Sequence, residues 1–369
     1  MLRRGIATFT LDYGRCPKWL FERMVKLGRE MVRLVVEEEG PEEFLRRLAE
    51  PAWFQALGTV LAFDWNSSGL TTILTAALKE AVRGEEQNLG IFICGGKGKT
   101  SKKTPGQISH WGEKLALAPS AVEGLVYNSK MAAKVDSALV QDGFQIYHHS
   151  FFFTRSGAWT VVQQGMNTEN QTARRYHWHS AEITDLICEP HSAITSEIKL
   201  PRVLNLTAQD SGEARQLSTE LVSQSLRPLF KDLILLDKYS TPYSKTAHLQ
   251  VAEGQLTLLN LADTEFKYHS VVRENFSASV YLKKILERLC YEKPPTYEKL
   301  LATVGVGPKT VRALALVAEI IYGAKLSYRD PARYSFAHGG KDATPYPVDR
   351  KTYDRTIETL KKCAKRLRF

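Results

Sequence analysis

Histidines and acidic residues crowd the middle of the chain in a pattern that could bind a metal ion. Six of the nine histidines lie between positions 110 and 191, among several carboxylates. If the stretch around position 178 is a strand, His177 and His179 project to the same face, as chelation requires. His191, Glu189 and the catalytic candidate Asp136 could complete a site for Mg, Mn or Zn. Such an ion would activate water for phosphodiester hydrolysis.

A metal-independent site is the second interpretation of the same region. Residues 147–153 and 161–167 resemble one half of the phospholipase D type of phosphodiesterase, in which a histidine on one strand attacks phosphorus. An asparagine that follows a glycine on the next strand completes that half-site. The resemblance gives these catalytic roles to His149, or its neighbour His148, and to Asn167, although the family's lysine two residues after the histidine is missing. In a third interpretation the histidines are structural side chains packed in a sheet.

The sequence Gly-Val-Gly-Pro-Lys-Thr at 305–310 is the clearest nucleic-acid motif in the chain. Hydrophobic spacing predicts a helix at 297–304 before it and an amphipathic helix at 311–322 after it. Two glycines let the backbone turn tightly and approach a phosphate, and a helix N-terminus aims N–H groups at that phosphate. The arrangement resembles the helix-hairpin-helix of DNA repair and recombination proteins, which contacts the DNA backbone irrespective of sequence. The predicted contacts are Gly305, Gly307, Lys309 and Thr310.

The lysine of this motif raises a second enzymatic hypothesis. In base-excision glycosylases that carry such a hairpin, a lysine in a GVGxKT context can be the nucleophile, and an aspartate lies one helix further on. Lys309 stands at the matching position, and Asp330 lies roughly where the acid is expected. This resemblance implies a DNA glycosylase or lyase that forms a Schiff base.

A segment rich in glycine and lysine follows a predicted buried strand at 89–94. Backbone amides and lysine side chains together form a phosphate cradle. The segment is not a nucleotide-binding P-loop, because Ile93 takes the place of its first glycine and a polar loop ending at Pro105 replaces the expected helix. We therefore predict contacts with nucleic-acid phosphate and no nucleotide cofactor, and the alternative is a basic surface loop. The predicted contacts are Gly96, Lys97, Gly98 and Lys99, with Arg174 and Arg175 beside the histidines.

The composition indicates a globular protein with a polyanionic partner. The formal net charge is +10, the sequence pI is about 9.2, and the basic segment 351–369 ends the chain. Such a charge favours nucleic acid or an anionic membrane as the partner. Scattered cysteines without a CxxC pair argue against disulfides, and the apolar runs are too short to span a bilayer. We therefore expect a cytoplasmic protein without an export signal that binds DNA and no membrane.

Hydrophobic periodicity divides the chain into three parts. We expect an α/β candidate catalytic domain over 1–200, a mostly helical region over 201–292, and a helix-hairpin-helix module with a basic tail over 293–369. A Pro-Pro step marks the last boundary. In the first part, helices broken at Gly40-Pro41 alternate with apolar runs in a βαβ-like rhythm, and a β-hairpin turns at Ser156-Gly157. The predicted fold class is therefore mixed α/β with a helical C-terminal part.

The segments that resemble a single known family are Asp64–Gly69, Gly95–Lys99, Lys134–Asp136, Gln141–Gly143, Gln163–Asn167, Arg174–Trp178 and Glu189–His191. That family occurs largely in archaea and some bacteria and is known only as a domain of unknown function. The leading hypothesis is a DNA-binding nuclease of DNA repair or recombination. The alternatives are a glycosylase or lyase using Lys309 and a non-catalytic DNA-binding protein. The choice between DNA and RNA and the oligomeric state stay open, with a homodimer as one option.

Overall fold

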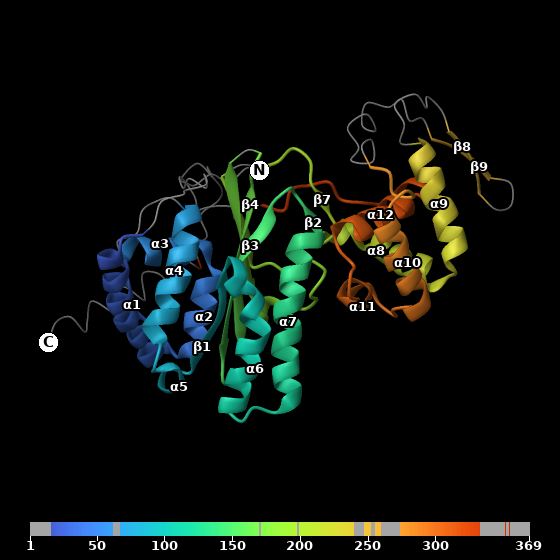
Figure 1. Cartoon of the computed structure of the whole chain (residues 1–369). Coiled ribbons are helices and arrows are strands. Elements are labelled where there is room, and N and C mark those ends of the chain that lie inside the picture. The colour runs from blue at the N-terminus through green and yellow to red at the C-terminus, as the bar shows by residue number, and fades with distance from the viewer. Residues whose placement is uncertain are drawn as a thin grey trace.

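The fold of this chain comes from a computed structural model, which describes residues 16–61, 67–169, 171–197, 199–239, 247–251, 255–259 and 274–332, with Lys351 and Asp354. A sheet lies at the centre of the described part, with helices on both faces and a helical bundle to one side (Figure 1). The predicted mixed α/β class with a helical C-terminal part is therefore confirmed.

Every neighbouring pair in the five-stranded central sheet is antiparallel, in the order β1-β3-β4-β5-β6. The predicted β-hairpin is present, since β3 and β4 pair across a turn at Ser156-Gly157. The βαβ-like rhythm was a wrong guide to the connections, because hydrophobic spacing marks elements and does not specify which strands pair. The strands are β1 (Ile91–Lys97), β3 (Gln145–Thr154), β4 (Trp159–Asn167), β5 (Thr172–His179) and β6 (Ala193–Ser196).

Both faces of the central sheet are covered, so its strands place core side chains on each side. In β3, Phe151 and Phe153 belong to one apolar cluster, whereas Phe152 belongs to the other. This alternation is the ordinary period of two in a strand. It also directs most polar side chains of the inner strands into the protein interior, on one face or the other, whereas Gln145 at the start of β3 is exposed.

The N-terminal helices cover one face of the sheet (Figure 1). The first helix ends at Gly40, whose φ is +89°, and the next begins at Pro41, so the predicted break is confirmed. Glycine adopts this left-handed conformation without steric cost. The helices of this region are α1 (Lys18–Glu39), α2 (Pro41–Ala49), α3 (Pro51–Val60), α4 (Ser67–Val82) and α5 (Glu86–Leu89).

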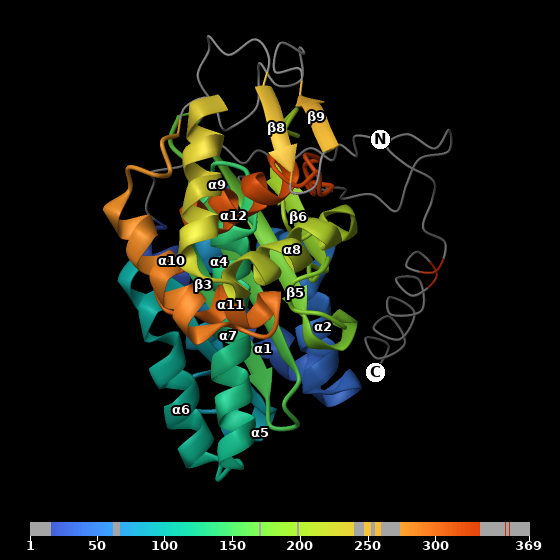
Figure 2. The ribbon, with the colours of Figure 1, turned by 90° about the vertical axis from the view of Figure 1, so that its right-hand side faces the viewer.

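Helices α6 and α7 cover the opposite face, and the bundle α8–α12 lies beyond α7, in front of the sheet in Figure 2. One apolar cluster continues from Phe151 of the sheet through Val135 of α7 to Leu286 and Leu314 of the bundle. The helices on this side are η1 (Gly98–Lys103), α6 (Thr104–Lys114), α7 (Pro119–Ala138), η2 (Ser180–Glu182), η3 (Gln209–Ser211), α8 (Gly212–Ser223), α9 (Leu226–Tyr239), α10 (Val280–Glu292), α11 (Tyr297–Ala302) and α12 (Pro308–Ile320).

Short strand pairs and helix breaks complete the C-terminal half. In the region expected to be mostly helical, α8 ends at Ser223 and α9 begins at Leu226. The Pro-Pro step lies between α10 and α11, which contribute to the same apolar cluster. The strand pairs are β2 (Val140–Gln141) with β7 (Leu204–Asn205), and β8 (Ala247–Val251) with β9 (Gln255–Leu259).

Two stretches singled out in the sequence lie largely outside the described residues. The segment 64–69 is described only from Ser67 onward, and the basic segment 351–369 only at Lys351 and Asp354. Among the helices that the structure describes, none is both long and apolar enough to cross a membrane.

Candidate nucleic-acid interface

A tight turn with two glycines joins α11 to α12. Gly305 has a φ of +93°, and a Cβ added to it would lie only 2.4 Å from Cδ1 of Ile285. Gly307 has an extended backbone and caps the N-terminus of α12, which begins at Pro308. Proline suits the first position of a helix because its missing N–H would have no partner there. Only glycine therefore fits at 305, both for its backbone angle and for its contact with α10.

Side chains from neighbouring helices hold the carbonyl groups of this turn. Lys134 of α7, Arg288 of α10 and Tyr281 of α10 donate to the carbonyls of residues 303, 304 and 305 at 2.8, 2.9 and 3.0 Å, respectively. Burial lowers the pKa of Lys134 from its ordinary value. With the carbonyls directed toward the protein, the amide groups become the free polar groups of the turn.

Four amides of the turn and of the first turn of α12 have no acceptor within the described part of the chain, namely those of Gly305, Gly307, Lys309 and Thr310. The first N–H groups of a helix lack intrahelical partners, and their partial positive charge attracts anions. Solvent reaches this part of the molecule, since Val304 is 76% exposed and Pro308 is exposed as well. The amides of Gly305, Gly307 and Lys309, which are partly exposed residues, can therefore donate to the oxygens of a phosphate group.

The side chains of Lys309 and Thr310 differ in what they can contribute. The ammonium of Lys309 is partly exposed and lies 5.9 Å from the ring centroid of Phe276. Thr310 is only 2% exposed, because it belongs to the inward face of α12. Lys309 can add a charge to a phosphate contact, whereas Thr310 is too deeply buried to contribute one in this structure.

The glycine–lysine segment leaves β1 and forms the short helix η1. Gly96 and Gly98 have φ values of +141° and +58°, so both need the freedom of glycine. Lys97 and Lys99 are exposed, and the Lys97 ammonium lies 5.8 Å from the ring centroid of Tyr147. The lysines are therefore placed at the surface, where a phosphate could reach them.

A helix follows this segment directly, and the expectation of a polar loop in its place was wrong. Helix α6 begins at Thr104 with Pro105 in its first turn, a position at which proline favours a helix. The amide of Gly95 donates to Gln107 at 2.8 Å and its carbonyl accepts from Lys79 at 2.9 Å, so both groups are already used inside the protein.

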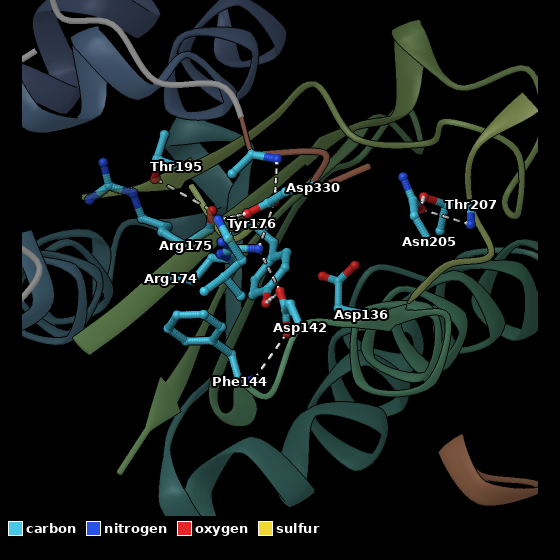
Figure 3. Close-up of polar contacts among 12 residues, drawn as sticks. Asp136, Asp142, Phe144, Arg174, Arg175, Tyr176, Thr195, Asn205, Thr207 and Asp330 are labelled. Atoms are coloured by element: carbon cyan, nitrogen blue, oxygen red, sulfur yellow. Dashed lines mark hydrogen bonds and ion pairs between the residues drawn. The ribbon is translucent and has the colours of Figure 1, made fainter. Parts of the chain in front are cut away.

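Arg174 and Arg175, predicted to bind nucleic acid, are fully buried. Arg174 lies between Asp142 and Asp330, each at 2.8 Å, and Arg175 points away from that cluster (Figure 3). On the other face of β5, Nε of Arg175 donates to Nε2 of His177 at 2.8 Å. Consecutive strand residues point to opposite faces, and both faces are covered. In the structure the two arginines are therefore internal cross-links rather than surface ligands for phosphate.

The carboxylates around Arg174 tie together distant parts of the chain. Asp142 also accepts from the hydroxyl of Tyr176 at 2.8 Å. Asp330 also accepts from the amides of Leu200 at 2.7 Å and Ala332 at 2.9 Å. A buried charge is tolerated only when it is paired and hydrogen-bonded, as the Nη atoms of Arg174 and the two carboxylates are here. The segment that follows the bundle is thereby attached to β5 of the sheet.

Asp330 and Lys309, the two residues of the lyase hypothesis, have separate partners. Nη1 and Nη2 of Arg174 donate to the two carboxylate oxygens of Asp330, which is 5% exposed. The Lys309 ammonium instead lies over Phe276 at the start of α12. The structure does not bring this lysine and this carboxylate together as an acid–nucleophile pair.

His149 lies at the centre of a buried chain of hydrogen bonds. Its Nδ1 is 2.9 Å from Oε1 of Gln163, and its Nε2 is 2.9 Å from Oγ of Ser129. Because Nε2 of Gln163 donates to Asp136, Oε1 accepts from the Nδ1–H group of the imidazole. Nε2 of His149 then accepts a hydrogen bond from the Ser129 hydroxyl. Burial lowers the pKa of His149, against the opposing effects of Gln163 and Asp136, which favours the neutral ring.

Ser129 and Gln163 are polar partners that the sequence analysis missed. Ser129 lies 20 positions from His149 in the sequence and on a different element, so no local pattern connects them. A hydroxyl, an imidazole and an orienting group in this order resemble an activated nucleophile. However, Ser129 is 2% and His149 5% exposed, so the group is enclosed between α7 and the sheet.

The other residues of the predicted phosphodiesterase half-site lie apart from His149. Asn167 is four residues along β4 from the position that pairs with His149, or roughly 13 Å at about 3.3 Å per residue. His148 points to the opposite face, where its Nε2 lies 3.1 Å from the hydroxyls of Thr75 and Ser150. Burial lowers the pKa of His148 to about 3. The histidine and the asparagine are therefore not assembled around one phosphate.

The four predicted metal ligands do not converge. His177 and His179 share one face of β5, as predicted, but both nitrogens of His177 already have protein partners. His191 lies on the opposite face, with its Nε2 at 2.5 Å from Asp136, and Glu189 stands in a turn with a φ of +47°. Within the described ranges, no three His, Cys, Asp or Glu side chains are grouped closely enough to hold a metal ion.

Comparison with known proteins places the chain in a family. A family model described as "Protein of unknown function (DUF763)" matches residues 5–348. No curated protein matches the chain, and no solved structure does either. The family match spans most of the chain and confirms the predicted relationship to a domain of unknown function. The chain therefore belongs to the DUF763 family.

Proposed function

We propose that this protein binds the sugar-phosphate backbone of DNA through the turn between α11 and α12. The supporting observation is the polarity of that turn. Its carbonyls are held by side chains of α7 and α10, while the amides from Gly305 to Thr310 include four without acceptors in the described part of the chain. Consecutive N–H groups at a helix N-terminus bind phosphate oxygens through hydrogen bonds and the helix dipole.

The charge of the chain and the exposed lysines of η1 support the same proposal. A net charge of +10 attracts a polyanion over a distance, and Lys97 and Lys99 offer a second phosphate contact. Phosphate contacts position a protein on DNA without reading its bases. The proposed complex is therefore sequence-nonspecific and weakens as salt rises.

Phosphodiester hydrolysis in DNA repair or recombination is the second candidate function, and the Ser129–His149–Gln163 chain is the observation that favours it. In that reaction Oγ of Ser129 would attack phosphorus while Nε2 of His149 accepts the hydroxyl proton. The P–O bond to the departing strand would break as its oxygen takes up that proton, and water would then hydrolyse the phosphoserine to release the other strand. The attack requires an accessible hydroxyl, and Ser129 is 2% exposed. A rearrangement of α7 would have to precede the reaction, which is why binding ranks first.

A salt titration of DNA binding tests the main proposal. Fluorescence anisotropy with a labelled duplex would give the dissociation constant of the wild type, Lys309→Gln and Lys18→Gln between about 50 and 200 mM salt. Lys18 lies on α1, across the sheet from the bundle, and its substitution removes the same charge. We expect Lys309→Gln alone to lower the slope of log K against log salt by about 0.9, the loss of one phosphate contact. Identical slopes in all three proteins would refute a contact at α12.

A cleavage assay separates the two candidates. Labelled single-stranded, duplex and branched DNA would be incubated with magnesium, with manganese or with EDTA. Product formed by the wild type and by Lys18→Gln, but lost in a folded Ser129→Ala variant, would establish hydrolysis at the buried chain. Tight binding without product under every condition is the result expected for a DNA-binding protein. Borohydride trapping on abasic DNA would reveal a Schiff base at Lys309 if the chain were a lyase.

A further inference from the structure

A cavity of about 460 Å³ opens beside the N-terminus of α12. Pro308 and Arg312 form part of its wall, so it begins next to the amides of the turn. The rest of the wall comes from the end of α7, β2, the turn before β3, and the segments around residues 203 and 328. Ligand pockets commonly enclose about 300–1,000 Å³, so the size suits a small organic group. The residues that face this cavity include Gly143, Phe144, Gln145, Arg202, Arg312 and Tyr328.

Two arginines and no acidic side chain line this cavity among the described residues. Arg312 donates from Nε to Gln141 at 2.6 Å and from Nη1 to Glu274 at 2.7 Å, which fixes its guanidinium plane. Its Nη2 has no acceptor in the described ranges. The guanidinium of Arg202 lies 4.4 Å from the ring centroid of Tyr328 at an exposed position. Such groups bind phosphate or carboxylate by paired hydrogen bonds.

The rest of the lining combines apolar and aromatic side chains with the polar Ser137, Gln141 and Gln145. Val140, Phe144 and Leu204 are buried, and Tyr328 adds a second ring. Gly143, with a φ of +81°, contributes backbone without a side chain. Apolar and aromatic walls with a few cationic groups are the environment in which a nucleobase stacks while its phosphate meets arginine.

The buried Arg174 cluster fixes one wall of this cavity. The guanidinium of Arg174 lies 4.6 Å from the ring centroid of Phe144, and Oδ1 of Asp142 accepts from the Phe144 amide at 3.0 Å (Figure 3). Arg174 and Asp142 therefore fix the position of the Phe144 ring, although both are buried and cannot contact a ligand themselves. A rigid wall lowers the entropic cost of binding a flat group.

We propose that this cavity accepts one unpaired nucleotide of a DNA strand whose backbone is bound by the turn between α11 and α12. The inference rests on the proposed function and narrows its substrate class. A paired base is stacked inside the duplex and cannot enter a pocket without being displaced, whereas an unpaired one enters at little cost. The preferred substrate is then DNA with a single-stranded end, gap or fork next to a duplex.

Binding to three DNAs with equal numbers of phosphates tests this proposal. The probes are a blunt duplex, a duplex with a 5′ overhang and a duplex with a 3′ overhang, measured by anisotropy at fixed salt with the full chain. Stacking of one base on an aromatic ring contributes about 1–3 kcal/mol, so the wild type should bind one overhang roughly tenfold more tightly than the blunt duplex. Arg202→Gln should lose that preference, while Arg155→Gln should keep it. Arg155 is exposed in the β3–β4 turn, at the other end of the strand from Gln145.

A bulky substitution tests the cavity without changing its charge. Gln145 is exposed at the cavity, so Gln145→Trp should fill the space, abolish the overhang preference and leave the thermal midpoint unchanged. If the wild type binds all three DNAs equally, or if both cavity variants keep the preference, the cavity proposal is wrong. The backbone proposal is judged separately by Lys309→Gln, which should weaken binding to all three DNAs by the same factor.

Discussion

Arg174 carries a positive charge that solvent does not reach, and two carboxylates make that burial possible. His148, His149 and His177 are buried as well, and burial lowers the pKa of each ring. Each has one ring nitrogen within hydrogen-bond distance of another element, at Thr75, Ser129 and Leu48, respectively. The sequence analysis predicted nucleic-acid contacts for Arg174 and Arg175, since arginine is mostly exposed. For the histidines it left three roles open, namely metal binding, catalysis and structural packing in a sheet. The burial of the two arginines could not be predicted, since it depends on β5 being covered on both faces. The same coverage of β3 and β5 favours the structural interpretation of the histidines.

The ion pair of Arg174 leads to a prediction about stability. Arg174→Met leaves Asp142 and Asp330 buried without their counter-charge, and such losses cost about 3–5 kcal/mol. We expect urea denaturation to show that decrease in the free energy of unfolding, with Arg155→Met as the exposed control. The folded fraction should bind more weakly only to DNA with an overhang, because the loss of Arg174 removes the support of Phe144 in the cavity wall. An Arg174→Met variant with full stability and no binding to any DNA would contradict this structural role and support Arg174 as a phosphate ligand.

The pKa of His148 predicts how stability depends on pH. The folded ring has a pKa of about 3 against an ordinary value of 6.5, so between these values the unfolded chain binds a proton that the folded chain does not. The free energy of unfolding must therefore fall as pH drops from 6.5, by up to about 1.4 kcal/mol per pH unit from this group. We expect His148→Gln to flatten that fall in urea melts between pH 7 and pH 5, relative to the exposed-residue variant His110→Gln. Parallel curves for the wild type and His148→Gln would contradict the assignment.

Among the elements, the turn between α11 and α12 was anticipated most closely. Its glycines, its proline and the spacing of the flanking apolar residues are local signals, and the structure has helices ending at Ala302 and beginning at Pro308. The side chains that donate to its carbonyls were not anticipated. Lys134, for example, lies 169 positions before Thr303 in the sequence, and only the packing of α7 on the bundle brings its ammonium to the Thr303 carbonyl. The antiparallel order of the sheet was missed for the same reason.

Gly305 gives a prediction at the scale of the turn. Gly305→Ala forces a side chain into a φ of +93° and against Ile285, and such strain costs about 1–3 kcal/mol. We expect a lower thermal midpoint and weaker duplex binding at temperatures where the protein is still folded. Gly124→Ala, at an open position within α7, should instead be neutral or stabilising by about 0.5–1 kcal/mol. A Gly305→Ala variant that keeps both stability and affinity would show that the turn geometry does not matter.

In the whole molecule, the sheet with its helix layers and the bundle form one connected structure. The apolar cluster runs through both, and side chains cross between them, as from Gln141 to the carbonyl of Pro308 at 2.9 Å. The position of the turn relative to α7 is therefore set by the entire fold. The composition gives the net charge of +10. The burial of so many polar side chains could not be predicted from it, because that burial depends on helices covering both faces of the sheet.

Nonspecific binding is the prediction that belongs to the whole molecule. Two duplexes of equal length and shuffled sequence should bind with affinities that agree within about threefold, because phosphate contacts carry no base information. Anisotropy at several salt concentrations would show both the equality and a common slope. A preference of about 1,000-fold or more for one sequence, as specific complexes show, would contradict backbone binding.

The most direct test of the central claim is amide hydrogen exchange at the turn, followed by NMR with and without a duplex. Our account predicts that the amides of Gly305, Gly307 and Lys309 exchange more slowly once DNA is bound, because each donates to a phosphate oxygen. The amide of Gly157, in the distant β3–β4 turn, should exchange at the same rate in both samples. Unchanged exchange at all three turn amides under conditions of saturated binding would contradict the account and place the DNA elsewhere on the protein.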